Sequence, residues 1–306
     1  MFAHRTVALT LVLLASALRQ NPESRTATQP QSQPQAPQSQ PQSRPGPVAD
    51  LAARVAAAQR RDTAPKEVGA FRAFLTIDPV KGDTALQFRG RLAYSRPGMI
   101  HFRLAGDPKI TEAMFDGTAY WQVDKDGRAE ELTRKETKST RDEMDRRLTL
   151  CEQIARLLFV DQAMLRMKDA QLSDVDDYRQ PGDKTATPAV LVRGTLDDYP
   201  LYHAPDYTGR VALQLWLRKD GLRPLALRAT PLDKLPAVKD EPPRRPFTEE
   251  LEFSGLELAS GVEVPDEIRL YLVDARGQQA LRFSARVDEL ELNPALTRAD
   301  FQPRKK

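Results

Sequence analysis

The chain has 306 residues, of which 46 are lysine or arginine and 43 are aspartate or glutamate, so its formal net charge is only +3. This near balance argues against a nucleic-acid-binding protein, which usually carries a basic stripe or a much larger basic excess. Hydrophobic residues make up 40 % of the chain, enough for a substantial core, and the single cysteine excludes an internal disulfide.

The N-terminus has the three parts of a secretory signal peptide. A short basic start precedes an apolar run over residues 6–14, and Ala15-Ser16-Ala17 is a small-x-small cleavage site. The apolar run is shorter than the about 20 residues that span a bilayer, and Leu18 stands where a lipoprotein signal needs cysteine. We therefore predict that residues 1–17 are removed and that the mature protein is soluble in the periplasm or elsewhere in the cell envelope. Retention of the segment as a membrane anchor is the alternative.

Residues 18–47 are predicted to be a linker. Most of this segment, from Gln29 to Pro47, consists of Gln, Pro and Ser. Such a composition offers no apolar surface to bury, so the segment is expected to be a disordered spacer. A Pro-rich docking segment is the alternative interpretation. The folded domain is expected over residues 48–303.

The folded part begins with one helix and then changes to strands. Residues 48–61 place apolar side chains on one helical stripe, and the helix should stop before Pro65. Residues 86–94 alternate strictly, with Phe88, Leu92 and Tyr94 on the apolar side, as in a half-buried strand. Further strands are expected at residues 99–104, at 119–123 and, after a hairpin turn at 126–127, over a few more residues.

The centre of the chain is predicted to be helical. Residues 128–147 are dense in charge and lead into residues 147–170, whose apolar positions suit the buried face of a helix. Cys151 lies on this stripe and is expected to be a buried small hydrophobe, with a reactive thiol as the alternative. The methionines of the stripe could form a lid over a ligand, but core packing is the favoured interpretation.

Strands resume in the second half of the chain. They are expected at residues 189–194, 211–229 (a hairpin), 249–258, 268–273 and 280–287, with a Pro-rich loop at 231–246. Consecutive strands usually pair with one another, which favours an antiparallel meander. Few helices beside one dominant sheet give the α+β class.

No established catalytic or metal-binding motif is present. The sequence has no GxSxG, HExxH or P-loop pattern, and His101 and His203 lack the spacing of metal ligands. Asp124, Asp126 and Gly127 fit a hairpin turn better than a calcium loop. We predict a protein without enzymatic activity, cofactor or metal. An exported hydrolase that uses a histidine or a pair of carboxylates is the weakest alternative.

Four segments follow one another in a recognisable order: FRGRLAYSRPGMIHFRL, MFDGTAYWQVD, LQLWLRKDGLRPLALRA and LRFSARVDELELNPALTRADFQP. Together with the signal, the first helix and a strand region around AFRAFLTI, they resemble the LolA/LolB-like outer-membrane lipoprotein carrier superfamily in its paired strands, its DG…W segment, its late hairpin and its closing strand. The resemblance covers most of residues 48–303. The Gln/Pro tract, residues 129–147 and the Pro-rich segment after Thr230 resemble insertions.

The resemblance implies a single large curved antiparallel sheet, an incomplete β-barrel, wrapped around a few helices. It implies a hydrophobic cavity for lipid or lipoprotein acyl chains, a carrier or sorting role, and envelope proteins as further partners. A non-catalytic envelope scaffold with the same fold and no lipid is the alternative. The cavity would be lined by residues on the apolar side of their strands: Phe88, Leu92, Phe102, Leu213, Leu215, Leu227, Leu270 and Phe283. The family's lid-latching arginine has no single counterpart, since Arg89, Arg91 and Arg103 all lie on the polar side.

Overall fold

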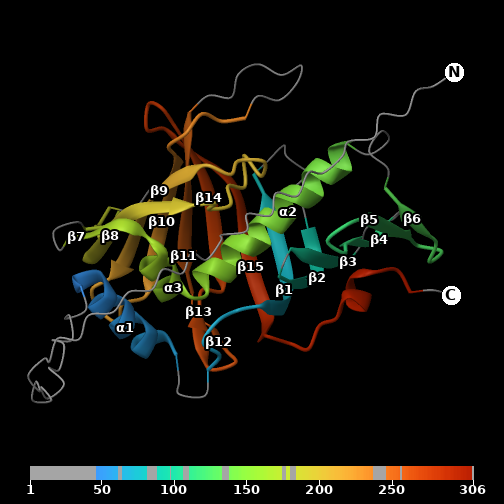
Figure 1. Cartoon of the computed structure of the whole chain (residues 1–306), viewed down its shortest axis with the longest axis horizontal. Helices are drawn as coiled ribbons and strands as arrows, with labels where there is room; N and C mark the ends of the chain where they lie inside the picture. The colour runs from blue at the N-terminus through green and yellow to red at the C-terminus, as the bar shows by residue number, and fades with distance from the viewer. Residues whose placement is uncertain are drawn as a thin grey trace, which may run out of the picture. The chain divides into compact units, whose positions relative to one another are not determined.

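The structure is a computed structural model (Figure 1). It describes residues 46–60, 64–80, 88–96, 98–105, 110–132, 138–173, 177–179, 184–236, 246–255 and 257–304. The predicted signal peptide and nearly all of the predicted linker lie outside the described residues, so both stay predictions. Within the described part, no helix is long and apolar enough to cross a membrane.

The first predicted helix is confirmed as α1 (Pro47–Gln59). Pro47 suits the first turn because its missing N–H would have no partner there, and Asp50 lies where the helix dipole favours a negative charge. The buried stripe contains Leu51, Ala52 and Val55. This stripe turns the helix toward the core, as the sequence pattern predicts.

One antiparallel sheet contains thirteen of the described strands, which confirms the predicted α+β class. Its members are β1 (Ala70–Pro79), β2 (Phe88–Ser95), β3 (Met99–Leu104), β4 (Ile110–Phe115), β5 (Tyr120–Asp124), β6 (Ala129–Glu131), β7 (Lys168–Ser173), β8 (Ala189–Asp197), β9 (Arg210–Arg218), β10 (Pro224–Pro231), β11 (Phe247–Ser254), β14 (Glu267–Asp274) and β15 (Gln279–Leu292). A separate hairpin pairs β12 (Glu257–Ala259) with β13 (Val262–Val264).

The sheet joins two meanders through its first and last strands. The order is β6-β5-β4-β3-β2-β1-β15-β14-β11-β10-β9-β8-β7, so sequential pairing is confirmed within each half. The pairing of β1 with β15 connects the halves, with Phe71 opposite Leu292 and Ile77 opposite Ala285. The outer strands β6 and β7 do not pair with each other in this order. The sheet is therefore curved and open, as the resemblance implies.

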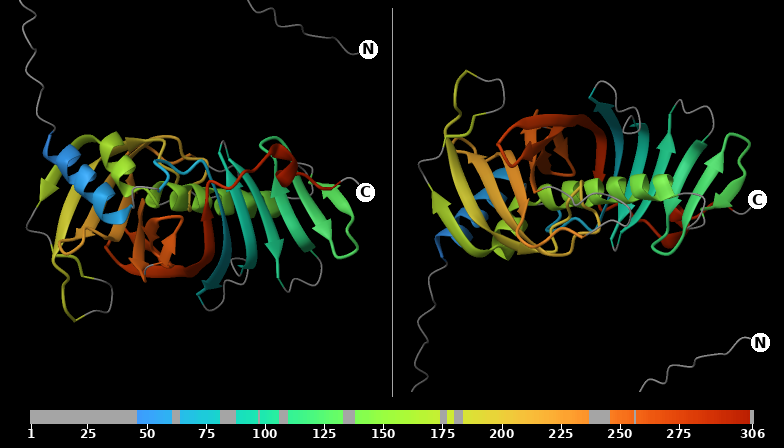
Figure 2. Two further views of the ribbon diagram at one scale, coloured as in Figure 1. Left: turned by 90° about the horizontal axis from the view of Figure 1, so that it is seen from below. Right: turned by 90° about the horizontal axis from the view of Figure 1, so that it is seen from above.

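The helices lie against one face of this sheet. Figure 2 shows α2 (Lys138–Leu157) running along the sheet across both meanders, with α1 and α3 (Val160–Arg166) beside the β7–β10 end. Buried Leu150, Cys151 and Ile154 of α2 join the core cluster with the apolar sides of the strands. We call the side of the sheet that α2 covers the inner face and the opposite side the outer face.

Two predicted elements need correction, and three strands were not predicted. The predicted helix over residues 147–170 is divided, because α2 ends at Leu157 and Phe159 is not helical before α3. It also ends at Arg166, because residues 168–173 pair with β8 as strand β7. The predicted strand at 249–258 ends at Ser254, because Gly255 has a positive φ of 64° and a Cβ there would clash with Asp266. Strand β4 was not expected, and neither were β7 and β13.

Candidate functional site

The eight predicted cavity residues come together on the inner face. All are buried, with exposed fractions of 0–2 %, in one hydrophobic cluster with α2: Phe88, Leu92, Phe102, Leu213, Leu215, Leu227, Leu270 and Phe283. Several are direct cross-strand neighbours, such as Leu92 with Phe102 and Leu270 with Phe283. In this structure they form a packed core, and contact with a ligand stays a prediction.

An arginine that the sequence did not single out faces this core. The guanidinium of Arg147 on α2 lies 5.3 Å from the ring centres of both Phe88 and Phe102. Such cation–π contacts contribute about 0.5–2 kcal/mol, depending on desolvation. Arg91 and Arg103 lie instead on the outer face, as their polar phase predicts. Arg147 is therefore the arginine that links a helix to the predicted cavity residues.

A cleft opens where α2 and α3 pass the ends of β2 and β8, and we call it the mouth cleft. Its apolar part has a volume of about 30 Å³ and includes Val68, Ala155, Phe159, Ala163, Leu196 and Tyr199 in its lining. An adjoining polar part of about 270 Å³ is lined by Tyr94, Arg96, Gly98, Glu152 and Arg156. Arg96 and Arg156 line both parts. The apolar part has room for about one water molecule, so it is closed in this structure.

The mouth cleft contains a buried hydroxyl without a partner. The Oη of Tyr199 has no hydrogen-bond partner among the described residues. Burial and the nearby Glu249 raise the pKa of Tyr199, so the phenol stays protonated and is a donor. The guanidinium of Arg156 lies 5.9 Å from the centre of the Tyr199 ring. The Tyr199 ring thus lies next to a cation of the cleft, and its hydroxyl is a donor without an acceptor among the described residues.

One carboxyl competes for the cations of the mouth cleft. Burial raises the pKa of Glu152, while Arg156 and Arg96 oppose that shift. Burial also raises the pKa of Tyr94, which lines the same polar part. Glu152 therefore lies beside the same two arginines that line the cleft, and burial disfavours its charged form.

The histidines are structural in their contacts. His101 has its Nδ1 2.8 Å from the Asp300 carbonyl oxygen and its Nε2 2.8 Å from Glu112 Oε2. His203 has its Nδ1 3.1 Å from Glu249 Oε1, and its Nε2 accepts from Arg282 Nε at 3.3 Å. Every ring nitrogen thus has a protein partner, and neither ring offers a free base.

The other candidate chemistry of the sequence is also accounted for. Cys151 is fully buried, as predicted, and burial raises the pKa of its thiol, which disfavours the reactive thiolate. Within the residues that the structure describes, no group of three or more His, Cys, Asp or Glu side chains is arranged to hold a metal ion. Asp124 accepts hydrogen bonds from the backbone N–H groups of Asp126 and Arg128, which is the predicted hairpin turn.

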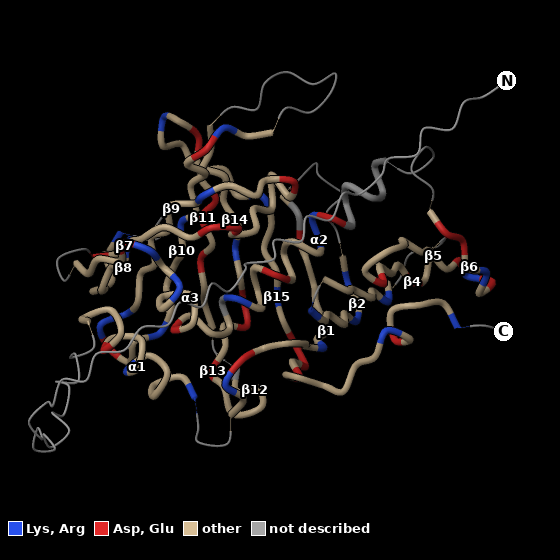
Figure 3. Tube along the Cα trace, viewed as in Figure 1, with Lys and Arg blue, Asp and Glu red and all other residues tan. Residues whose placement is uncertain are grey.

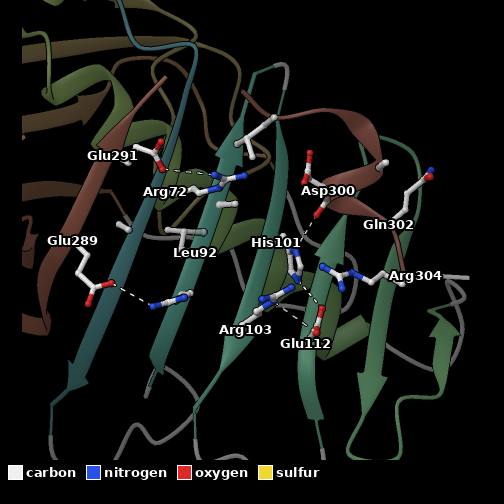
Figure 4. Close-up of a pocket in the computed structure, with 15 residues that line it drawn as sticks. Arg72, Leu92, His101, Arg103, Glu112, Glu289, Glu291, Asp300, Gln302 and Arg304 are labelled. Atoms are coloured by element: carbon white, nitrogen blue, oxygen red, sulfur yellow. Dashed lines mark hydrogen bonds and ion pairs between the residues drawn. The ribbon is translucent and has the colours of Figure 1, made fainter. Parts of the chain in front are cut away.

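A second hollow, the outer groove, lies on the outer face between β1–β4 and the C-terminal arm, residues 293–304 (Figure 4). Its volume is about 540 Å³. His101, Ala93 and Gln302 contribute to the lining. The lining also includes four arginines and four carboxylates: Arg72, Arg91, Arg103, Arg304, Glu112, Glu289, Glu291 and Asp300. Lys and Arg alternate with Asp and Glu along the described chain as a whole, as Figure 3 shows.

Asp116 fixes the C-terminal arm that forms one wall of the outer groove. Its Oδ2 accepts hydrogen bonds from Arg298 Nη2 at 3.2 Å and Gln302 Nε2 at 2.6 Å, on either side of the buried Phe301 in η2 (Arg298–Phe301). Burial alone would raise the pKa of the Asp116 carboxyl, but hydrogen bonds from Gln302 and from Thr118 lower it well below its usual range. The arm is therefore held by a carboxylate that stays ionised.

Among known proteins, this chain matches solved structures by their fold. No family model matches the chain, and no curated protein matches it. Similar solved structures include a DUF1329 family protein from Desulfovibrio piger, with 16 % identity over 83 % of this chain and 95 % of that chain and a TM-score of 0.42. They also include a LolA superfamily protein from Nitrosomonas europaea, with 11 % identity over 83 % of this chain and 97 % of that chain and a TM-score of 0.38.

A third similar structure is an outer membrane lipoprotein-sorting protein domain from Vibrio parahaemolyticus. It has 10 % identity over 83 % of this chain and 95 % of that chain, with a TM-score of 0.35. The superfamily that the sequence motifs resemble is thus among the structural neighbours. The identities and TM-scores are too low to transfer a ligand or a role to this chain.

Proposed function

We propose that this chain is an exported, non-catalytic cell-envelope protein that binds a lipid or lipoprotein acyl chain at the mouth cleft, in a carrier or sorting role. The observation that carries the proposal is Tyr199, whose ring faces the Arg156 guanidinium at the apolar part of the cleft and whose buried hydroxyl has no partner among the described residues. A hydroxyl buried without a partner costs about 1–3 kcal/mol. A polar ligand head would supply the missing acceptor.

The head of the ligand would lie at Arg96 and Arg156, which line both the apolar part that contains Tyr199 and the polar part. Arg96 and Arg156 offer charge-assisted hydrogen bonds to a carboxylate or an ester oxygen. Glu152 is the carboxyl that such a head displaces, and burial already disfavours its charged form. A single-chain amphiphile with a polar or anionic end fits this chemistry better than a fully apolar ligand.

The tail would lie between the helices and the inner face, which requires α3 to move. The helical conformation is interrupted between α2 and α3 at Phe159, whose φ of −127° and ψ of 69° are not helical. On its other side, α3 is tied to α1 by the ion pair of Asp161 with Arg60. Val160 and Met164 of α3 also pack into the core cluster, so opening of α3 uncovers them. A ligand tail that covers these side chains would stabilise such a minor open state. The eight predicted residues of the inner face would contact the tail in that state.

The second candidate function is a non-catalytic envelope scaffold without a lipid. The observation that favours it is the closed inner face, where α2 and the strands bury all eight predicted positions. The two candidates differ in one measurable property, because only the first requires saturable binding of an amphiphile.

Binding of a fluorescent fatty-acid probe to delipidated protein tests the proposal. Ala163→Trp fills the apolar part of the mouth cleft, and Arg156→Gln removes a cation from its polar part. Each should weaken probe binding about tenfold, a change of roughly 1.4 kcal/mol. Arg89→Gln is the matched control, because it removes the same charge from an exposed position of β2 that lines neither the mouth cleft nor the outer groove.

The pattern across variants decides between the candidates. Saturable binding that is weakened in the cleft variants and kept in Arg89→Gln supports the amphiphile carrier. Urea unfolding of each variant establishes that a loss of binding is not a loss of folding. Absence of saturable binding to folded wild-type protein contradicts the proposal and leaves the scaffold function.

A further inference from the structure

Two arginines on the outer face stand directly opposite each other. Arg91 of β2 and Arg103 of β3 are cross-strand partners in the antiparallel register, and both line the outer groove. Side chains in such positions have Cβ atoms about 4.5–5.5 Å apart, and like charges placed there repel each other. Their pairing therefore opposes sheet stability, which makes a binding role the better explanation for it.

The carboxylates near Arg91 and Arg103 do not come within hydrogen-bond distance of the two guanidiniums. Arg91 Nη2 lies 3.7 Å from Glu289 Oε2, and Arg103 Nε lies 3.8 Å from Glu112 Oε1. Both separations exceed a hydrogen bond. Glu112 gives its other oxygen to His101 at 2.8 Å, so it is already engaged. Both guanidiniums keep most of their donors available to a ligand.

A third cation reaches the same place from the C-terminal arm. Figure 4 shows Arg304 extending from the arm toward Arg103 and Glu112. Arg304 forms no ion pair with another described residue, so its donors are also available. The arm itself is fastened through Asp116, which places Arg304 opposite the sheet.

The floor of the groove leaves room beside the arginines. In the neighbouring cross-strand row, Ala93 stands between Arg72 and His101, and its small side chain creates a hollow between two long ones. The groove volume of about 540 Å³ lies within the range of small-molecule sites, roughly 300–1,000 Å³.

We propose that the outer groove binds a phosphate group between Arg91, Arg103 and Arg304. A carboxylate has two oxygens and is satisfied by one guanidinium fork, whereas a tetrahedral phosphate offers acceptors to several forks at once. The phosphate replaces Glu289 as the partner of Arg91, while Glu112 stays with His101. The site lies on the outer face, so it is separate from the amphiphile proposed for the mouth cleft. The phosphate belongs either to a small soluble ester or to a lipid headgroup.

Two titrations distinguish the sources. The first measures binding of inorganic phosphate to the full protein by calorimetry at low ionic strength. The second measures co-flotation with phosphatidylcholine vesicles that contain a minor fraction of phosphatidic acid, against vesicles of phosphatidylcholine alone. Arg91→Gln and Arg103→Gln should each weaken binding about tenfold, as expected for the loss of a charge-assisted hydrogen bond. Arg89→Gln is the matched control, because Arg89 is exposed two residues earlier in β2 and lies outside the groove lining.

A further variant is expected to raise the affinity for phosphate. Glu289→Gln removes the carboxylate that competes for Arg91, so it should tighten phosphate binding several-fold. Glu289 is exposed, and the substitution keeps its size, so folding should be unaffected. A purely structural role for the Arg91–Glu289 pair predicts no gain in phosphate affinity.

Each outcome of the two titrations either supports or overturns the proposal. Saturable binding of inorganic phosphate, weakened in Arg91→Gln and Arg103→Gln and kept in Arg89→Gln, supports the site with a soluble ligand. The same variant pattern with phosphatidic acid vesicles alone supports it with a lipid headgroup. Equal weakening in all three arginine variants shows diffuse attraction and overturns the proposal. Absence of binding in both titrations overturns the proposal as well.

Discussion

Replacing Tyr199 with phenylalanine removes a single hydroxyl from a side chain that is 1 % exposed. That hydroxyl has no hydrogen-bond partner among the described residues. A buried polar group without a partner costs about 1–3 kcal/mol, and the aromatic ring keeps its packing in the variant. We therefore expect Tyr199→Phe to raise the free energy of unfolding of the ligand-free protein by about 1 kcal/mol, the low end of that range.

Urea unfolding followed by the fluorescence of Trp121 and Trp216 measures this change. With a slope of about 1–3 kcal/mol/M, a gain of about 1 kcal/mol raises the midpoint by roughly 0.3–1 M at an unchanged slope. Tyr207→Phe is the matched control. The Tyr207 hydroxyl donates to the Arg210 carbonyl oxygen at 2.5 Å and accepts from the Asp233 N–H at 3.1 Å. Removing it should lower stability by about 0.5–1.5 kcal/mol.

The same variant should weaken the binding of an amphiphile while it stabilises the free protein. Loss of one hydrogen bond to the ligand head corresponds to about 0.5–1.5 kcal/mol, or roughly a two- to tenfold higher dissociation constant for the fatty-acid probe. If Tyr199→Phe instead loses stability as Tyr207→Phe does, the hydroxyl has a partner in the free protein and the reasoning fails. Unchanged probe affinity would equally remove Tyr199 from the site.

Three further predictions concern the core, the C-terminal arm and the N-terminus. Phe102→Ala should lower the free energy of unfolding by about 3–5 kcal/mol, measured in urea, because the ring is packed in the core; a much smaller loss would indicate an open cavity. The pKa of Asp116 is lowered in the folded state, so its stabilisation is present above about pH 4 and is lost as the pH falls further. Asp116→Asn should therefore flatten the fall in melting temperature below about pH 4. N-terminal sequencing of exported protein should find a mature chain that starts after Ala17, and a chain that still starts at Met1 would contradict the signal peptide.

The strands with one buried face were predictable from the sequence. In β2 the buried positions Phe88, Leu92 and Tyr94 alternate with exposed Arg89 and Arg91, so the pattern alone shows the element and its orientation. The adjacent strand β3 follows the same rule. These strands have solvent or a shallow groove on the outer face, which keeps the alternation clear.

Strands covered on both faces were not predictable. Met114 of β4 points to the outer face but is buried, in the part of the sheet that the C-terminal arm and Phe301 cover, so β4 shows no alternation. Strand β7 continues directly from the helical stripe and is specified by its pairing with β8. The pairing of β1 with β15 depends on contacts more than two hundred residues apart, which local patterns do not encode.

Neither hollow was predictable as a site, because each is assembled from distant segments. Arg96, Arg156 and Tyr199 of the mouth cleft come from a turn, a helix and a loop. The sequence segment YPLYHAPDY is conspicuous for its tyrosines, but nothing in it indicates that one hydroxyl lacks a partner. The outer groove depends on the register that places Arg91 opposite Arg103, and register is a property of the folded sheet.

Native mass spectrometry of the protein isolated from its own cell envelope tests the central claim most directly. The spectrum should show a fraction of molecules that carry one single-chain amphiphile, and gentle activation should release it as an identifiable ion. The Ala163→Trp variant, isolated in the same way, should show a clearly smaller fraction of ligand-bound molecules. Wild-type protein that carries no amphiphile, either as isolated or after incubation with excess fatty acid, would contradict amphiphile binding at the mouth cleft.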